Sequence, residues 1–243
     1  MTIRVDKRAK VISISSGKGG VGKTTISACL ALHLISLGKK VGLLDADLYG
    51  PSIPTLFNLA NAKAQAMQDR ILPICYGQLE LASIAFLVEP GSALAWRGPM
   101  LAKALAQMLE QVCWHANLDY LIIDTPPGTG DVHLSLFANY KIEGAIMVTT
   151  PSNLSFADVE RCIDLHSKFH IPVLGLIENM AYLQLPHSQE KLYPFGKGDS
   201  LHLAEKFAIK SFQQVPLWHN SNDLSIEDMS KKVKINLQDL GFE

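Results

Sequence analysis

A glycine-rich stretch that ends in Lys-Thr-Thr carries the most specific chemistry of the sequence. It reads Gly17-Lys18-Gly19-Gly20-Val21-Gly22-Lys23-Thr24-Thr25 and fits the pattern G-x-x-x-x-G-K-[ST]. Glycines let phosphate oxygens approach backbone N–H groups, and the start of the following helix attracts anions. We therefore expect a phosphate-binding loop in which Lys23 holds the β- and γ-phosphates and the Thr24 hydroxyl ligates Mg²⁺. A chance glycine-rich turn is the alternative, and the expected strand before it and helix after it argue against that alternative.

Three aspartates follow apolar runs and are candidates for the same site. Asp124 closes YLIID, and Asp45 and Asp47 lie where VGLLDADLYG leaves its strand. A carboxylate buried without a partner costs several kcal/mol, so we expect Asp124 to contact Mg²⁺, directly or through water. Asp45 and Asp47 lie on one face of an extended segment, so both can point at the nucleotide. We expect Asp47 to orient the attacking water, and a plain loop or capping role is the alternative for each of the two.

Short apolar strands and amphipathic helices alternate along the chain and must position these residues. Apolar runs without polar alternation are typical of parallel strands that are buried on both faces. Strands are expected at 11–15, 41–45, 79–86, 120–124, 144–150 and 173–179, with a weaker one around Val215. Helices are expected over 22–37, 99–115 and 155–169, the last with a possible cap at Ser155. The pattern predicts an α/β fold, a doubly wound, mostly parallel sheet flanked by helices on both faces, in a single domain over 1–243 with an irregular excursion at about 60–78.

Composition and charge argue against several classes of function. Lys and Arg number 22 against 23 Asp and Glu, and this balance gives no indication of nucleic acid or of an anionic membrane as a partner. The segment MTIRVDKRAK has no apolar core, so we expect no secretory signal. All apolar stretches are well short of the ~18 residues that span a membrane. The four cysteines lie far apart, and we expect reduced, mostly buried thiols in a cytoplasmic protein.

The additional lysine of the loop, Lys18, makes GKGGVGKTT resemble the deviant Walker A loop of the MinD, ParA and nitrogenase iron protein class of ATPases. Three further segments resemble the Mrp (ApbC/Nbp) subfamily: DADLYGPSIP (45–54), WRGPM (96–100) and DYLIIDTPPGTGD (119–131). GLIENM (175–180) and FGKGD (195–199) are weaker matches, and the resemblance covers roughly residues 10–220. It implies a P-loop ATPase whose cofactors are ATP and Mg²⁺ and whose homodimer encloses two ATP molecules.

The resemblance also implies a role for each matching position. Lys18 would reach the phosphates bound by the partner subunit, and Lys18, Lys23 and Asp47 would be the catalytic residues. Asp124 would occupy the Walker B position and hold Mg²⁺ together with the loop threonine, while Asn179 would bind adenine. A solvated loop lysine at 18 and an ordinary turn former at 179 are the alternatives. The implied nucleotide-binding set is Gly17, Lys18, Gly19, Gly20, Val21, Gly22, Lys23, Thr24, Thr25 and Asn179.

The chain departs from the subfamily at the iron–sulfur ligands. Mrp proteins resemble cluster carriers because a C-P-x-C run lets two subunits share one cluster, whereas the corresponding positions here are Leu185 and Ser188. Leucine cannot ligate iron, and serine is a poor substitute for a soft thiolate. Ligation by His187, or recruitment of Cys29 or Cys162 from their expected helices, is the alternative. We therefore expect no iron–sulfur ligands in this chain.

The expected function is slow, Mg²⁺-dependent ATP hydrolysis in iron–sulfur cluster assembly, with an iron–sulfur apoprotein or a cysteine-bearing relative as a possible partner. One alternative is a MinD/ParA-like positioning switch that binds a membrane or a partner protein in its ATP state. Nucleotide binding with almost no hydrolysis is another. The C-terminal stretch bears on the switch, because a helix there either lies on a membrane or, as is more common, packs on the sheet. Its apolar face would be made of Ile226, Met229, Val233, Leu237 and Leu240.

Overall fold

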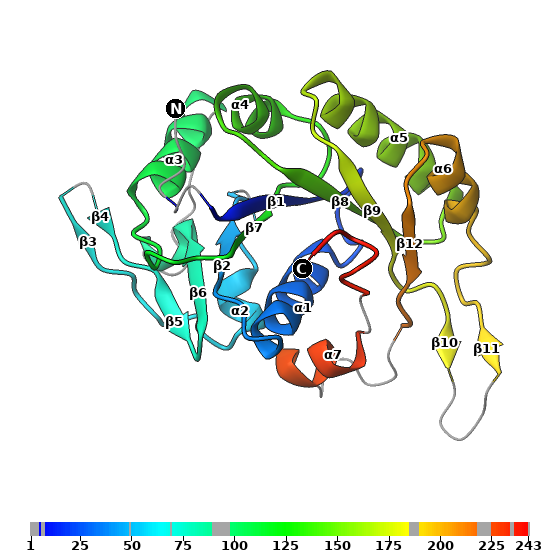
Figure 1. Ribbon diagram of the computed structural model, residues 1–243, viewed down its shortest axis with the longest axis horizontal. Helices are drawn as coiled ribbons and strands as arrows, with labels where there is room; N and C mark the ends of the chain where they lie inside the picture. The colour runs from blue at the N-terminus through cyan, green and yellow to red at the C-terminus, as the bar shows by residue number, and fades with distance from the viewer. Residues whose placement is uncertain are drawn as a thin grey trace.

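Eight strands form the central sheet, in the order β12-β9-β8-β1-β7-β2-β6-β5 (Figure 1). The structure is a computed structural model that describes residues 5, 8–48, 50–68, 70–88, 98–184, 190–217, 225–233 and 236–242. Neighbouring strands are parallel except for β5, which pairs antiparallel with β6. The strands are β1 (Lys10–Ser15), β2 (Val41–Asp45), β5 (Ile74–Tyr76), β6 (Leu79–Ser83), β7 (Tyr120–Asp124), β8 (Gly144–Thr149), β9 (Val173–Glu178) and β12 (Ser211–Gln214).

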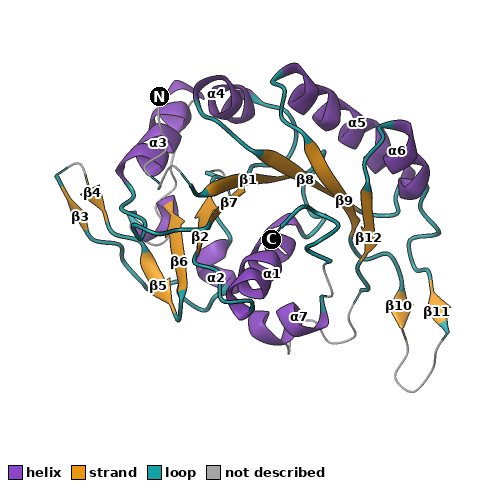
Figure 2. Cartoon of the chain, viewed as in Figure 1, coloured by secondary structure: helices purple, strands orange, loops and turns teal. Residues whose placement is uncertain are grey.

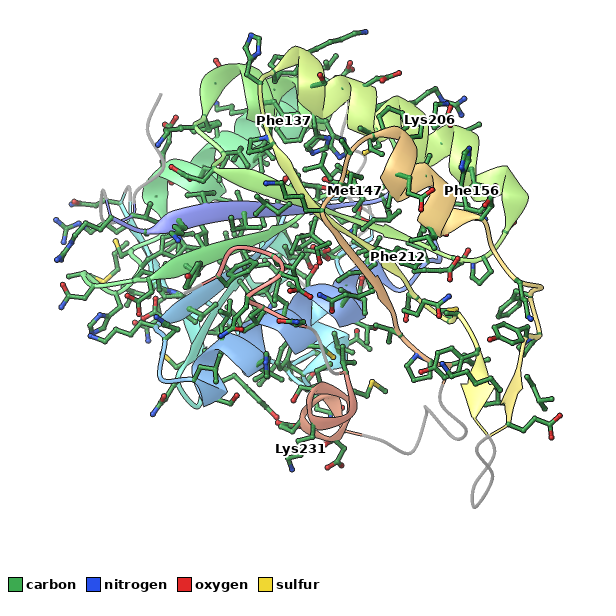
Figure 3. The ribbon with its side chains drawn as sticks, turned by 45° about the vertical axis from the view of Figure 1, so that its right-hand side comes forward. Phe137, Met147, Phe156, Lys206, Phe212 and Lys231 are labelled. Atoms are coloured by element: carbon green, nitrogen blue, oxygen red, sulfur yellow. The ribbon has the colours of Figure 1, made fainter. Side chains whose placement is uncertain are left out.

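Helices cover both faces of this sheet, as expected for a doubly wound fold (Figure 2). One layer contains α1 (Lys23–Ser36), α2 (Ile53–Leu56) and α7 (Ile226–Lys232). The other contains α3 (Gly98–Gln111), α4 (Asp131–Asn139), α5 (Asn153–Lys168) and α6 (Ser200–Lys206). Each layer closes its own apolar core against the sheet. In Figure 3 the side chains of Phe137 and Met147 lie in one of these cores, whereas Lys206 and Lys231 lie on the outside.

Each predicted strand is present, with corrections at the ends. The run predicted as a strand over 79–86 changes at Ser83, which accepts a hydrogen bond from Ala85 N and starts the 3-10 helix η1 (Ile84–Phe86). A serine that caps in this way stops the strand. The weak strand predicted around Val215 is β12, which ends one residue before it.

The predicted helices are also present, with different bounds. The prediction of Ser155 as a cap was wrong: α5 begins at Asn153, because the backbone at Ser152 is extended and takes the N-cap position. The helix predicted over 99–115 ends at Gln111. The excursion at 60–78 is more regular than expected, since it contains the hairpin of β3 (Ala66–Met67) and β4 (Arg70–Ile71) and the edge strand β5. Strands this short leave no periodic pattern in the sequence.

The C-terminal stretch packs on the sheet. α7 ends at Lys232 and lies against α1, so the apolar residues predicted for one helical face do not share a helix. Val233, Leu237 and Leu240 are buried in the core on the α1 side of the sheet. The stretch thus packs inward, as in the common alternative, but as the short helix α7 against α1 followed by buried residues outside that helix. Within the described residues, no helix has the length and hydropathy to cross a bilayer.

The carboxyl ends of the central parallel strands place the predicted chemistry at one edge of the sheet. In the strand register Ile14 of β1 lies beside Asp124 of β7, and Asp45 of β2 lies on the other side of Asp124. β1 leads directly into the glycine-rich loop and α1. Three segments that are distant in sequence thus meet at this edge, as expected for ligand sites in open α/β sheets.

Candidate functional site

The glycine-rich loop, which connects β1 to α1, forms one wall of a cavity of about 290 Å³. Gly22 is the N-cap of α1 with a φ of 80°, and no side chain caps the helix, so the first N–H groups of α1 remain available to an anion. The predicted residues from Lys18 to Thr25 and Asp47 all line the cavity, together with Ser16, Ser52, Leu56 and Pro127. This is the geometry of a phosphate-binding loop.

Gly17, also predicted to bind nucleotide, lies against helix α5 outside the cavity lining. A Cβ atom at this position would lie 2.4 to 2.6 Å from the main chain and Cβ of Asp158 and the backbone N of Val159. Such distances leave no room for a side chain. The first glycine of the motif is therefore required for the close approach of the loop to α5.

Asp124 is fully buried behind the loop and accepts three hydrogen bonds from α1. Its Oδ1 accepts from Lys23 Nζ at 2.6 Å and from Ser27 Oγ at 2.9 Å, and its Oδ2 accepts from Thr24 Oγ1 at 2.7 Å. Lys23 is itself only 6% exposed, so each charge compensates the other in a place that water scarcely reaches. The buried carboxylate and the threonine hydroxyl are hard oxygen ligands, and this donor set fits Mg²⁺.

Asp45 is buried beside Asp124 and holds the backbone of the loop that follows β2. Its carboxylate accepts from the backbone N of Asp47 at 3.2 Å, from the backbone N of Ile53 at 3.3 Å and from the Ser83 hydroxyl at 3.2 Å. Burial, and next the charge of Asp124, raise the pKa of Asp45 to about 8. Asp45 does not line the cavity, so the structure favours the loop and capping role over contact with the nucleotide.

Asp47 lies between the phosphate cavity and a second cavity of about 680 Å³. It is half-buried, and its Oδ1 accepts a hydrogen bond from Gly50 N at 3.3 Å. The second cavity is bounded by the turn after β7, including Pro126, Pro127 and Gly130. Asp47 thus borders both the phosphate cavity and the space beside the turn after β7.

Lys18 lies in the glycine-rich loop, whereas Asn179 directly follows β9 and contacts the loop from outside. Lys18 lines the phosphate cavity, and no described acidic side chain forms an ion pair with it. Asn179 is 5% exposed and does not line the cavity. It donates one amide hydrogen to the carbonyl oxygen of Val21 at 2.8 Å. A Cβ at Gly22 would lie 2.3 Å from the Asn179 amide nitrogen, so Asn179 holds the loop, and its Oδ1 and second amide hydrogen remain for another partner.

A buried polar network behind Asp124 was not predicted. The Thr125 hydroxyl donates to the carbonyl oxygen of Ile14 at 2.8 Å and lies 3.2 Å from both Ser15 Oγ and His133 Nε2. Ser15 Oγ in turn lies 3.3 Å from His166 Nε2. Burial lowers the pKa of His133 to about 3 and that of His166 to about 4, so both rings are neutral at pH 7. The network ties β1 and the residue after β7 to α4 and α5. The contacts that Thr125 and His166 make with β1 span more than 100 residues and leave no local sequence signal.

The region of the missing cysteine pair lies outside the described residues, as do Leu185, His187 and Ser188. The flanking strands β10 (Leu183–Gln184) and β11 (Lys191–Leu192) pair as a hairpin. Cys29 and Cys162 are buried as expected, and burial raises the pKa of each thiol to about 12. In the described part of the chain, no three His, Cys, Asp or Glu side chains form a group that could hold a metal ion.

The remaining cysteines correct the expectation that the thiols are mostly buried. Cys75 is exposed because it lies on the edge strand β5, and Cys113 is half-buried. All four cysteines are free thiols.

Comparison with known proteins identifies relatives of this site and fold. A family model described as ParA, NUBPL iron-transfer P-loop NTPase, matches residues 7–239. The iron–sulfur cluster carrier proteins of Aquifex aeolicus and Escherichia coli are 46% and 43% identical over 209 and 208 residues. The matches cover 85% of this chain but only 57% and 56% of those proteins. The chain therefore spans less than two thirds of the length of these curated relatives.

Solved structures are also similar to this chain. A nucleotide-binding protein from Archaeoglobus fulgidus, in complex with ADP, is 39% identical with a TM-score of 0.79, over 95% of this chain and 90% of that chain. The septum site-determining protein MinD of Pyrococcus horikoshii, complexed with Mg-ADP, is 23% identical with a TM-score of 0.52, over 89% of this chain and 79% of that chain. The second likeness shows a shared fold.

Proposed function

The chain belongs to the ParA/NUBPL family of iron-transfer P-loop NTPases, and from this premise we propose that it binds ATP with Mg²⁺ and hydrolyses it slowly in the service of iron–sulfur cluster assembly. The proposal rests on one observation. Lys23 and Thr24 hydrogen-bond to Asp124 at the uncapped N-terminus of α1, beside the phosphate cavity. A lysine and a helix N-terminus provide positive charge for phosphate, and the two oxygen groups suit Mg²⁺.

Nucleotide binding at this site would give Lys23 and Thr24 new partners in place of Asp124. Lys23, now on Asp124, would hold the β- and γ-phosphates, and the Thr24 hydroxyl, now on Asp124 Oδ2, would hold Mg²⁺ together with Asp124. Bound Mg²⁺ would neutralise charge on the phosphate oxygens. Asp47, between the two cavities, would accept a hydrogen bond from the attacking water and orient it toward the γ-phosphate. In this proposal Asn179 fixes the loop through Val21 and offers its remaining amide atoms to adenine.

The proposed active form is a homodimer in which Lys18 completes the partner's site. Lys18 faces the phosphate cavity, and no described acidic group competes for its ammonium. A second positive charge where negative charge develops would speed phosphoryl transfer. This arrangement corresponds to the deviant Walker A loop of the sequence, and it makes hydrolysis dependent on dimerisation.

The role in cluster assembly is proposed from the relatives, with one difference. The two curated relatives are named iron–sulfur cluster carriers, whereas the sequence of this chain has no C-P-x-C run. We propose that it acts on an iron–sulfur apoprotein, or with a cysteine-bearing relative that holds the cluster, in the cytoplasm where its free thiols stay reduced. The positioning-switch alternative has no comparable support, because the C-terminal apolar residues that suggested membrane binding are buried.

Titration of a fluorescent ADP analogue with Mg²⁺, followed by an ATPase assay, tests the nucleotide part of this proposal. Wild type is expected to bind and slowly hydrolyse. Lys23→Ala is expected to lose both, and Lys168→Ala, at an exposed position near the end of α5, is the matched control. Equal binding by Lys23→Ala and wild type would contradict the assigned site.

Anaerobic reconstitution with iron and sulfide tests the cluster part. A cysteine-bearing relative is expected to load a cluster under conditions in which this chain alone does not. A cluster on this chain alone would show that ligands outside the expected pair are used.

A further inference from the structure

Ser27 is a buried serine on α1 for which the proposed function provides no role. It lies one helical turn after Thr24 and has no exposed surface. Its hydroxyl oxygen is 2.9 Å from Asp124 Oδ1 and 3.0 Å from the backbone carbonyl oxygen of Lys23. A serine hydroxyl has one hydrogen, so it can fully serve only one of these two acceptors at a time.

Nucleotide binding would make Asp124 the acceptor that depends most on that hydrogen. In this structure Asp124 Oδ1 already accepts from Lys23 Nζ at 2.6 Å. When Lys23 and Thr24 turn to the phosphates and the metal, Asp124 loses two of its three donors. Ser27 is the donor to Asp124 that neither the nucleotide nor the metal would take away. A charged carboxylate is a stronger acceptor than a neutral carbonyl, and the carbonyl of Lys23 keeps its backbone bond within the helix.

We propose that Ser27 is a positioning residue, whose hydroxyl stays on Asp124 Oδ1 when Mg²⁺–nucleotide binds and holds that carboxylate toward the metal. The proposal rests on the proposed function. Asp124 has no exposed surface, so solvent does not replace the two lost donors, and without Ser27 one carboxylate oxygen would be left buried without a hydrogen bond. Such an oxygen is costly to leave unsatisfied.

Ser27→Ala removes the hydroxyl, and Ser13→Ala is the matched control. Ser13 is equally buried, on β1, and its hydroxyl makes no hydrogen bond within the described part of the chain. The measurement is fluorescence titration of a labelled ADP, once in EDTA and once at increasing Mg²⁺. Ser27→Ala is expected to raise the half-saturating Mg²⁺ concentration about tenfold, as loss of a partner behind a metal ligand does. Its affinity for metal-free ADP is expected to equal that of wild type, and Ser13→Ala is expected to change neither quantity.

The outcomes separate this proposal from the proposed function. An unchanged Mg²⁺ midpoint for Ser27→Ala overturns the positioning role. An equal loss of ADP affinity with and without Mg²⁺ also overturns it, because the hydroxyl would then serve only the packing of α1. Failure of wild type to bind the labelled ADP in either condition refutes the proposed function itself, and the role of Ser27 falls with it.

Discussion

Two buried histidines are expected to make the fold sensitive to mild acid. His133 and His166 are 1% and 0% exposed. Burial lowers their pKa values from 6.5 to about 3 and about 4 in the native state. Unfolding returns each ring to its ordinary pKa, so below pH 6.5 the unfolded chain binds more protons than the native protein. The stability that depends on the two neutral rings is therefore fully present above pH 6.5 and is lost as the pH falls toward 4.

The size of this effect follows from the two pKa values. Each ring lowers the free energy of unfolding by about 1.4 kcal/mol for every pH unit below its unfolded pKa, until the native ring begins to protonate. At pH 5 each histidine therefore lowers the free energy of unfolding by about 2 kcal/mol, and the two together lower it by about 4 kcal/mol. This is a large part of the ~5–15 kcal/mol that stabilises a typical domain.

Urea unfolding of wild type and His166→Gln at pH 7.5 and pH 5 isolates one ring, because all other titrating groups are common to both proteins. The variant is expected to be less stable at pH 7.5, where it has lost packing and hydrogen bonds. The difference in unfolding free energy should become about 2 kcal/mol more favourable to the variant at pH 5. His202→Gln, at an exposed position on α6, is the control and should show a constant difference. A constant difference for His166→Gln would refute the assignment of a buried neutral ring.

Three further substitutions test the site. Asp47→Ala is expected to keep labelled ADP bound and to slow phosphate release about a hundredfold, because it loses the group that orients water; a normal rate would mean that Asp47 only stabilises its own loop. Asn179→Ala removes the bond to Val21 and is expected to weaken labelled ADP about tenfold, the equivalent of one buried hydrogen bond; unchanged affinity would be inconsistent with a loop-holding role. Gly17→Ala forces a Cβ against the backbone at Asp158 and is expected to lower the free energy of unfolding by about 1–3 kcal/mol in urea; an unfolding curve like that of wild type would disprove the close contact.

The sequence predicted the parts of the site that depend on local pattern. The loop from Lys18 to Thr25 could be located because glycine spacing, the preceding strand and the following helix are all local features. Asp124 could be located because an ionisable group ends a buried apolar strand. The parallel sheet followed from runs without polar alternation, and the parallel register then brought Asp45 and Asp124 side by side.

The remaining features depend on contacts between distant segments. Nothing near Gly17 shows that α5 will occupy the space of its Cβ, and nothing near Asn179 shows that its amide will bind the carbonyl of Val21. Asp45 and Asp47 share a face of an extended chain, but the turn after β2 directs only Asp47 to the cavity. The rings of His133 and His166 meet Thr125 and Ser15 only in the folded sheet.

The two edges of the sheet restrict how copies of this protein can associate. An exposed edge strand invites pairing with another chain, and short or covered edges prevent it. β5 has three residues and runs antiparallel to β6, its neighbour in the sheet. At the other edge, the Gln213 side chain of β12 donates to the carbonyl oxygen of Asn236 and accepts from its backbone N. Extension of the sheet from one molecule to the next is therefore disfavoured, so the proposed homodimer would have to form without strand pairing, as an association at the carboxyl ends of the strands would allow.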